Sequence, residues 1–328
     1  MSKIGTDVDR ALAVLADGGL VAIPTETVYG LAADASNPAA VQRIFGVKQR
    51  PTSHPLIVHL ADVSLVDDWA ADVDSSGRLL ADACWPGPLT LLLPRGPSVI
   101  DEVTGGRPTV GLRVPAHPMT TTLLERFAAQ IRRGGGLAAP SANRFGRISP
   151  TTAAHVDADL GDDVDYILDG GPCPIGVEST IVDCTVEPPQ LLRPGAITAE
   201  QIATLLGFRP AAADGPSRAS GMLTSHYAPR ARVLLVDSPT EVANAVAAAN
   251  VRTVVIGPSL SAKTSVFGDS ADSDDDLVDL ARYAASLYAQ LRAADDAGAE
   301  VIVAVLPPAA GLGHAIRDRL IKAAAPRS

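Results

Sequence analysis

Short apolar runs that stop at proline, glycine or a polar residue recur through the first two-thirds of this 328-residue chain, and they restrict its fold most strongly. The run at 20–23 follows Gly18-Gly19 and ends at Pro24, which is the pattern of a buried strand behind a turn. The same reasoning predicts a short strand before Pro140 and further strands at 56–60, 89–93, 109–114, 166–168, 180–183 and 190–193.

Helices are predicted between several of these strands. Asn37-Pro38 suits the N-cap and first turn of a helix over 38–47, and residues 198–201 show the capping-box pattern of another. A third helix is expected over 117–131. Because both helices and short loops join the strands, the pattern predicts an α/β fold with a twisted, open sheet of mixed strand direction.

An irregular stretch separates this region from the rest of the chain. Residues 209–230 contain scattered proline, glycine and serine without periodicity, which is typical of a domain connection or a functional lid. We therefore expect a first domain over 1–208, a linker over 209–231 and a second domain over 232–328.

The second domain shows an alternating β-α-β pattern. The expected strands lie at 233–236, 253–256 and 301–305, and the expected helices at 240–249, 276–294 and 313–324. This order predicts a small, doubly wound, Rossmann-like α/β domain. Gly311-Leu312-Gly313 opens the last helix, but Ile316 stands where a dinucleotide-binding motif has its third glycine, so a tight turn is the favoured interpretation.

Charge is distributed unevenly. Of the net charge of −10, most lies in residues 1–208, which carry 15 Lys and Arg against 24 Asp and Glu. Nucleic-acid affinity comes largely from Lys and Arg that neutralise phosphates, so tight nucleic-acid binding is not expected. Local cation clusters on an acidic body suit a small anionic ligand better. These clusters are Arg43 with Lys48 and Arg50, Arg132 with Arg133, and Arg144 with Arg147.

Several classes of protein are disfavoured. No apolar run reaches the ~18 residues of a membrane span, and the first ten residues lack a signal-peptide core, so a cytoplasmic protein without membrane association is expected. The three cysteines lack C-x-x-C spacing, which predicts reduced thiols and no structural zinc. The dipeptide Gly-Lys never occurs, which excludes a P-loop.

Lys48 and Arg50 form the sharpest candidate anion site. Pro51 favours extended backbone at Arg50, so the two cations could point toward one anion. The fork of arginine holds a phosphate bidentately, whereas lysine acts as a point charge. Taken alone, however, these residues are better explained as a solvated helix end, which favours cations through the helix dipole.

Two further segments place hydroxyls and a cation beside strands. Thr25 and Thr27 follow a buried strand and project to the same side, unless they only cap their own turn. On the strand over 109–114, the period of two puts Thr109 and Arg113 on one face with a bare glycine between them. A ligand surface and an exposed face with one ion pair both remain open.

The remaining candidates repeat this combination of hydroxyls and cations at strand ends. They are Ser141, Asn143, Arg144, Arg147, Ser149, Ser179, Thr180 and Arg193. No spacing implies a Ser/His/Asp triad or a metal-ligand set. Positioning and charge stabilisation without a nucleophile are typical of transfer at phosphorus, and Mg²⁺ would then arrive on nucleotide phosphates, with no protein ligands assigned.

Taken in order, seven blocks resemble the threonylcarbamoyl-adenylate synthase family, whose members share a YrdC-type catalytic domain. They are PTETVYGL (24–31), KQRP with HPLIVH (48–59), TVGLRVP (109–115), APSAN (139–143), GVESTIVD (176–183), LLRPG (191–195) and SHYAP (225–229). The last block and a terminal GLGHAIRDRL extend the resemblance to the long form of the family, which adds a linker and a small C-terminal domain.

The resemblance implies a reaction and a downstream partner. L-threonine, bicarbonate or CO₂, and ATP would give threonylcarbamoyl-adenylate and pyrophosphate. A separate tRNA threonylcarbamoyl-transferase complex would then move the threonylcarbamoyl group to the adenosine beside the anticodon. A non-catalytic RNA-binding or ribosome-assembly protein of YrdC-type fold is the alternative, and the acidic first domain weighs against it. The second domain would bind a regulatory metabolite or brace the linker.

The same resemblance implies roles for individual residues. The threonine pocket would comprise Thr27, His59, Arg113, Ala139 and Ser179. The ATP site would comprise Lys48, Arg50, His54, Thr109, Ser141, Asn143, Ser149, Arg193 and Tyr227. Lys48, Arg50 and Arg193 would offset charge on the phosphates, and Tyr227 would belong to a lid. Many family members have asparagine at the position of His54, so this histidine predicts a pH-dependent rate between roughly pH 6 and 8.

Overall fold

The computed structural model describes residues 3–214, 226–258 and 279–326. The chain forms two compact units, and we describe each by itself. The first contains Met1–Phe145, Ser149–Pro174 and Glu178–Met222, and the second contains Leu223–Ser328 with two short segments of the earlier chain. Part of the predicted linker, 215–225, and the predicted start of a helix at 276–278 lie outside the described residues.

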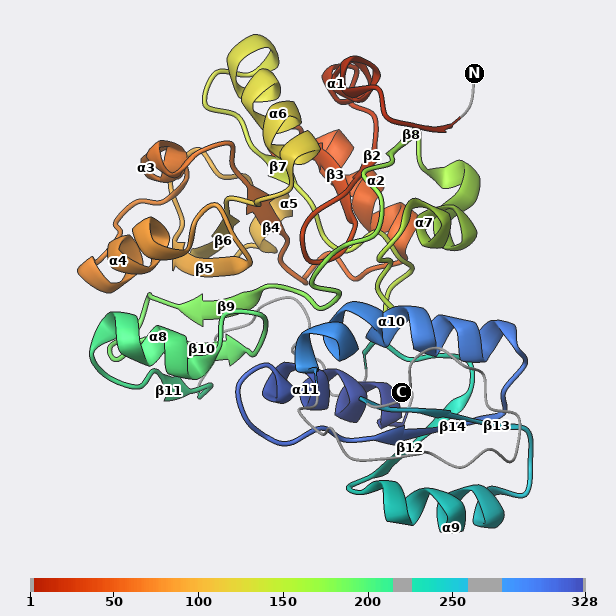
Figure 1. Ribbon diagram of the computed structural model, residues 1–328. Helices are drawn as coiled ribbons and strands as arrows, with labels where there is room; N and C mark the ends of the chain where they lie inside the picture. Colours follow the sequence, from red (N-terminus) through yellow and green to blue (C-terminus); the bar gives the residue numbers. More distant parts are fainter. Residues whose placement is uncertain (1–2, 215–225, 259–278, 327–328) are drawn as a thin grey trace. The chain divides into compact units, whose positions relative to one another are not determined.

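An eleven-stranded sheet organises the first unit (Figure 1). Its strand order is β1-β8-β2-β3-β7-β4-β6-β5-β9-β10-β11. The bounds are β1 Ile4–Gly5, β2 Val21–Ile23, β3 Gly30–Asp34, β4 Ile57–His59, β5 Leu89–Pro94, β6 Thr109–Arg113, β7 Leu137–Ala138, β8 Tyr166–Leu168, β9 Thr180–Asp183, β10 Gln190–Arg193 and β11 Ala211–Ala212.

Strand direction in this sheet is mixed, as the sequence predicted. Strands β4 and β6 are parallel neighbours, whereas β6 pairs antiparallel with β5 on its other side. Strand β5 in turn runs parallel to β9, which pairs antiparallel with β10. This arrangement brings the ends of β4 and β6 side by side, with His59 in register with Arg113.

Helices cover both faces of the sheet because alternate strand residues are apolar on either side. On β2, Val21 and Ile23 pack in one core cluster with helices α1 and α6, while Ala22 faces a second, larger cluster that includes α2 and α7. The helices are α1 Val8–Ala16, α2 Pro38–Lys48, α3 Val66–Trp69, α4 Ser75–Cys84, α5 Asp101–Thr104, α6 Pro118–Arg126, α7 Ala153–Leu160 and α8 Ala199–Leu206, with shorter turns at Val63–Leu65 and Gly161–Asp163.

The predicted helix starts are confirmed by their caps. The Asn37 side chain accepts hydrogen bonds from two backbone N–H groups of α2, whose first residue is Pro38. Thr198 and Gln201 form the reciprocal capping box at α8. The third helix differs from its prediction, because the α-helical geometry ends at Arg126 and a π-helical turn, Phe127–Ile131, continues it.

One short segment of the predicted linker joins the sheet. Ala211 and Ala212 form β11, which pairs parallel with β10 through Gln190 and Leu191. The edge strand β10 leaves a row of backbone groups unpaired on its outer side, and this dipeptide covers part of it. The expectation of irregular structure from residue 209 was therefore wrong for these two residues.

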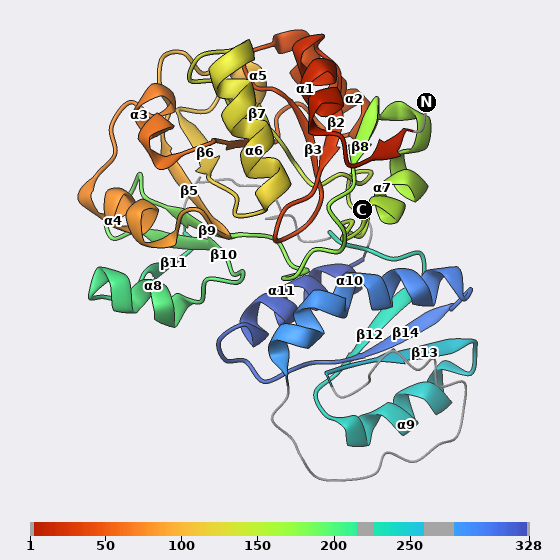
Figure 2. The ribbon, with the colours of Figure 1, turned by 45° about the horizontal axis from the view of Figure 1, so that its top comes forward.

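The second unit contains a three-stranded parallel sheet of order β12-β14-β13. Figure 2 shows α9 on one face of this sheet and both α10 and α11 on the other, which confirms the predicted doubly wound pattern. Gly313 is required by a close turn, since an added Cβ would lie 2.0 Å from the carbonyl oxygen of Pro308. The elements are β12 Arg232–Val236, α9 Pro239–Ala249, β13 Thr253–Ile256, α10 Leu280–Asp296, β14 Val301–Val305 and α11 Gly313–Ala324.

None of the three cysteines forms a disulfide. Cys84 is half-buried, and Cys173 and Cys184 are buried as free thiols. Burial raises the pKa of each of the two buried thiols to about 12. Among the described helices, we find none with both the length and the apolar character that a membrane span requires.

Candidate substrate-binding site

Buried polar side chains gather where strands of the first unit end. His59 is the last residue of β4 and Arg113 the last residue of β6, and the two are register partners. Both are buried, with 3% and 4% of their surface exposed. Lone charged residues are rarely buried this deeply unless they are paired, so the partners of Arg113 decide what the site can bind.

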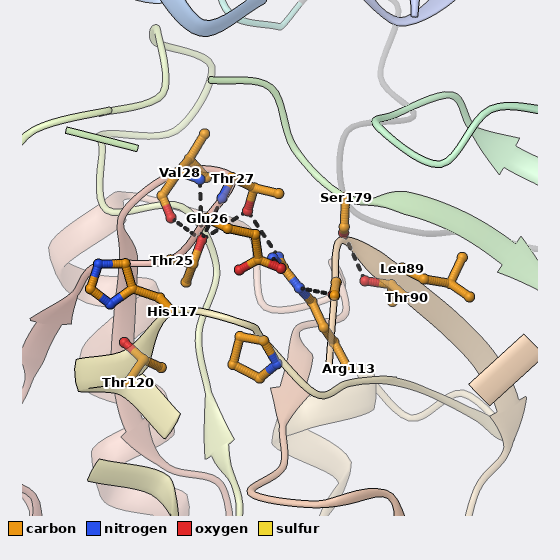
Figure 3. A network of polar contacts seen from close by, with 12 residues as sticks. Thr25, Glu26, Thr27, Val28, Leu89, Thr90, Arg113, His117, Thr120 and Ser179 are labelled. Carbon is orange, nitrogen blue, oxygen red and sulfur yellow. Dashed lines mark hydrogen bonds and ion pairs between the residues drawn. The ribbon is translucent and has the colours of Figure 1, made fainter. Parts of the chain in front are cut away.

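Arg113 contacts three groups from other segments (Figure 3). Its Nη1 donates to Thr27 Oγ1 at 3.0 Å, and its Nε donates to the carbonyl of Gly87 at 3.3 Å. Its Nη2 lies 2.8 Å from a carboxylate oxygen of Glu26, in an ion pair whose two side chains are 5% and 10% exposed. The structure thus brings Thr27 and Arg113 together, as the resemblance implied, and adds an unpredicted carboxylate.

The turn after β2 presents Thr27 to this guanidinium. Thr25 Oγ1 donates to the carbonyl of Val28 at 2.6 Å and accepts from the N–H groups of Thr27 and Val28. It also lies 2.8 Å from Thr27 Oγ1, which confirms that the two hydroxyls share one side. Thr25 therefore caps its own turn, and Thr27 faces Arg113.

His59 is held in its neutral form. Burial, together with the nearby Arg113 guanidinium, lowers its pKa from 6.5 to about 3. A neutral imidazole has one donor and one acceptor nitrogen, so His59 is equipped to orient a polar group and not to supply a cation.

We expect His59 to make the stability of the protein depend on pH. The unfolded chain binds a proton at the ordinary pKa of 6.5 and the folded chain only near 3, so the free energy of unfolding should decrease as the pH falls through this interval. Above pH 6.5, His59 is neutral in both the folded and the unfolded chain, so its titration no longer lowers the free energy of unfolding. Denaturant unfolding of the wild type and of His59→Gln at pH 7 and pH 4 measures this, and the loss of stability should be smaller in the variant. Equal losses in the two proteins would refute the assignment.

A second cluster lies at the start of β9. Ser179 Oγ is 2.8 Å from Thr90 Oγ1, and Arg193 Nη2 donates to Ser179 Oγ at 3.0 Å. Arg193 Nε also donates to the Ser179 carbonyl at 3.0 Å. Arg193 and Ser179, which the resemblance assigned to ATP and to threonine respectively, are thus direct neighbours.

Lys48 and Arg50 flank a left-handed residue at the end of α2. Gln49 has φ 53°, which stops the helix and turns the chain. Lys48 is 1% exposed, and its ammonium donates to the carbonyls of Ser141 and Asn143. Burial, reinforced by the charge of Arg50, lowers the pKa of Lys48 well below its usual value. These are two adjacent cations of the kind that phosphate would stabilise.

His54 lies beside the same cations. The edge of its ring meets Phe145, with the ring centroids 5.3 Å apart, and Arg50 lies 5.6 Å from the centroid of Phe145. Burial, then the charges of Arg50 and Arg107, lower the pKa of His54 below 6.5. The predicted effect of its titration on the rate is therefore displaced toward more acidic pH.

Other predicted residues occupy separate positions in the first unit. Ser149 is buried, and its hydroxyl donates to Glu178 Oε1 at 2.5 Å, one residue before Ser179. Ala139 follows β7, and its N–H donates to the carbonyl of Ile57 at 3.0 Å. Thr109 begins β6, half-buried and in register with Pro94.

Tyr227 belongs to the second unit. Its ring stacks on Tyr288 with centroids 5.7 Å apart, and the guanidinium of Arg319 lies 5.3 Å from the ring centroid. Tyr227 is buried and has φ 61°, an uncommon value for a residue with a side chain. Its proposed contact with ATP stays a prediction.

The sequence interpretation did not select Glu26, Thr90 or Glu178 as site residues. Glu26 stands between two threonines that were selected, and the need of a buried Arg113 for a counter-charge was the available signal. For Thr90, the available signal was that it is the one hydroxyl-bearing residue within the otherwise apolar strand β5. Glu178 offered no comparable signal.

The site combines buried cations, hydroxyls and the carboxylates of Glu26 and Glu178 at the strand ends of a mixed sheet. This defines an α/β protein of the class that the Sua5, YciO and YrdC family model describes, and that model, described as telomere recombination, matches residues 13–195. A second model, described as threonylcarbamoyl-AMP synthase C-terminal domain, matches residues 197–325. The chain belongs to the threonylcarbamoyl-AMP synthase family.

Relatives across two domains of life support this membership. The threonylcarbamoyl-AMP synthase of Pyrococcus abyssi is 39% identical over 323 residues, which cover 95% of this chain and 92% of the relative. That of Bacillus subtilis is 39% identical over 336 residues, which cover 100% of this chain and 95% of the relative. The crystal structure of Pyrococcus abyssi Sua5 complexed with L-threonine superposes with a TM-score of 0.85 at 37% identity, covering 97% and 94% of the two chains.

Proposed function

We propose that this chain forms threonylcarbamoyl-AMP and pyrophosphate from L-threonine, bicarbonate or CO₂, and ATP. The observation that carries the proposal is the buried Arg113 guanidinium, which faces Thr27 in a family that includes a threonine-bound structure. A rigid guanidinium is suited to hold a carboxylate bidentately, and that of threonine is the group assigned to it.

The chemical step that we propose is transfer at phosphorus. The amine of threonine takes up CO₂ and releases a proton, and an oxygen of the resulting carbamate attacks the α-phosphorus of ATP. A new bond forms between the carbamate oxygen and the α-phosphorus. The bond between the α-phosphorus and the oxygen that bridges it to the β-phosphorus breaks, and pyrophosphate leaves. Lys48, Arg50 and Arg193 would stabilise the charge that develops, which makes the chain a nucleotidyltransferase without a covalent intermediate.

The residue assignments follow the two clusters and the resemblance. The threonine pocket would use Thr27, His59, Arg113, Ala139 and Ser179, and the ATP site would use Lys48, Arg50, His54, Thr109, Ser141, Asn143, Ser149, Arg193 and Tyr227. The direct contact of Arg193 with Ser179 supports adjacent sites, as a reaction between the two substrates requires.

Mg²⁺ would accompany the nucleotide. No group of three or more His, Cys, Asp or Glu side chains that could hold a metal ion occurs within 3–214, 226–258 and 279–326. We propose that Mg²⁺ is carried by the ATP phosphates, whose negative charge it would offset, and we assign it no protein ligand.

The product would be consumed elsewhere. Threonylcarbamoyl-AMP is a reactive mixed anhydride, and we propose that a tRNA threonylcarbamoyl-transferase complex in the cytoplasm accepts it. The modified base would be the adenosine next to the anticodon. The acidic first domain argues against tight binding of the tRNA by this chain itself.

Pyrophosphate release tests the proposal directly. We expect release from ATP only when L-threonine and bicarbonate are both present, because the carbamate is the nucleophile. The measurement is a pyrophosphate assay with each substrate omitted in turn, with L-serine as the control amino acid and mass spectrometry of the adenylate. Release at the same rate without threonine would contradict the proposal, as would salt-sensitive tRNA binding without any threonine-dependent turnover.

A further inference from the structure

Buried polar atoms without hydrogen bonds are concentrated around Arg113. Among the residues that the structure describes, neither carboxylate oxygen of Glu26 has a hydrogen-bond partner, and the same holds for Arg113 Nη2 and His59 Nδ1. Proteins contain few such atoms, since leaving one unsatisfied costs about 1–3 kcal/mol. Two of these groups, the Glu26 carboxylate and Arg113 Nη2, face each other at 2.8 Å, and together they offer acceptors and donors to a small polar ligand.

The guanidinium retains donors for an incoming carboxylate. Arginine has five N–H groups, and Gly87 and Thr27 accept one each from Arg113. Glu26 lies 2.8 Å from Nη2, but the two groups are not aligned as a hydrogen bond. One N–H group of Nη1 and both N–H groups of Nη2 thus donate no hydrogen bond within the described structure, and a substrate carboxylate can accept from them without displacing Thr27 or Gly87.

Neither carboxylate oxygen of Glu26 accepts a hydrogen bond, although one of them is paired with Arg113. The residue is 7% exposed, the turn of Thr25–Val28 holds its backbone, and its carboxylate lies beside the Arg113 guanidinium (Figure 3). An ionised carboxylate has about four lone-pair sites. Its contact with the positive Arg113 is electrostatic, and both oxygens remain available to N–H donors.

A paired cation and anion, each with unused hydrogen-bonding groups, match an amino-acid zwitterion. We propose that Glu26 accepts the α-ammonium group of threonine while Arg113 binds its carboxylate. The contact belongs to the first complex, before the amine has reacted with CO₂. Glu26 thereby makes the site selective for a free α-amino acid over the corresponding hydroxy acid, a distinction that Arg113 alone cannot make.

This inference rests on the proposed function, because it takes threonine as the ligand. The competing explanation is that Glu26 only orients Arg113. The two differ in one respect: an orienting residue affects every carboxylate ligand, whereas an ammonium acceptor affects only ligands that carry the ammonium group. Paired ligands therefore separate them.

The experiment is titration calorimetry of the full chain with three probes. They are L-threonine, its 2-hydroxy analogue 2,3-dihydroxybutanoate, and ATP with Mg²⁺. For the wild type, we expect the hydroxy analogue to bind about 10- to 100-fold more weakly than threonine, since it lacks a charge-assisted hydrogen bond. In Glu26→Gln, threonine should lose a similar factor and the hydroxy analogue should change by less than about 3-fold. Glu26→Asp keeps the charge and should recover part of the selectivity, and ATP affinity reports that each variant is folded.

Three results would overturn the inference. The first is an equal loss of affinity for threonine and for the hydroxy analogue in Glu26→Gln. That result would mean that Glu26 only orients Arg113 and does not bind the ammonium group. The second is a wild type that binds the hydroxy analogue as tightly as threonine, a result that needs no variant to fold. The third is a wild type that binds no threonine, which also overturns the proposed function; the first two results leave that function intact.

Discussion

Replacement of Arg113 by alanine is expected to abolish threonine-dependent pyrophosphate release while ATP still binds. The guanidinium supplies the charge-assisted hydrogen bonds that we assign to the threonine carboxylate, and loss of a bidentate pair should weaken threonine binding about 100-fold or more. Arg113→Lys keeps the positive charge without the fork and should recover only a small part of the affinity. Calorimetry with threonine and with ATP, beside the pyrophosphate assay, measures each effect.

Stability must be separated from binding in this experiment. Arg113→Ala leaves Glu26 as an uncompensated buried charge, which should lower the free energy of unfolding by about 3–5 kcal/mol. A double variant, Arg113→Met with Glu26→Met, removes both charges and should regain most of that stability but no threonine binding. Full threonine-dependent turnover in either variant would disprove the assignment of Arg113 to the substrate carboxylate.

Lys48→Met is expected to lower the rate of pyrophosphate release by about 100- to 1,000-fold while threonine binding is retained. The amino group of Lys48 is buried, and burial, together with the charge of Arg50, lowers its pKa. Phosphate oxygens would supply negative charge, and this interaction strengthens as charge develops on the departing pyrophosphate. Single-turnover assays at saturating threonine measure the step.

Arg43→Met is the matched control for Lys48. Arg43 lies on the same helix, α2, and its ion pair with Asp165 is nearly half exposed, so its removal should change stability by less than about 1 kcal/mol and turnover not at all. Lys48→Met also frees the carbonyls of Ser141 and Asn143, so its unfolding free energy must be compared with that of the wild type. A folded Lys48→Met protein with the wild-type rate would contradict the proposed phosphate contact.

Local structure was predictable where neighbouring residues alone decide it. Asn37 caps α2, and Thr198 with Gln201 caps α8, because a side chain and the N–H groups it accepts from are within three residues of each other. The alternation on β6 placed Arg113 opposite the core-facing Val110 and Leu112 in the same way. Such patterns do not show which segments will meet.

For that reason, the contacts across the site could not be predicted from the sequence. Glu26 and Arg113 are 87 residues apart, and no local rule distinguishes a carboxylate that pairs with a buried guanidinium from one that faces water. The lowered pKa of His59 likewise depends on its burial in the fold. That burial follows from the spatial order of the strands, which could not be predicted from the sequence. The prediction of irregular structure for the whole linker failed for a related reason. Ala211 and Ala212 pair with the edge strand β10, and a contact with a distant strand cannot be predicted from the local sequence.

The sequence by itself determined the kind of side chains that the site contains and the family of the chain. Cations and hydroxyls at strand ends, in seven ordered blocks, were enough for this because they are chemical properties of the residues. Only the tertiary structure decided which of them are neighbours, which are buried, and that Glu26 forms an ion pair with Arg113 while neither of its oxygens accepts a hydrogen bond. Burial and pairing arise from contacts between distant segments, and they set the pKa of a group and the charge that it can bind.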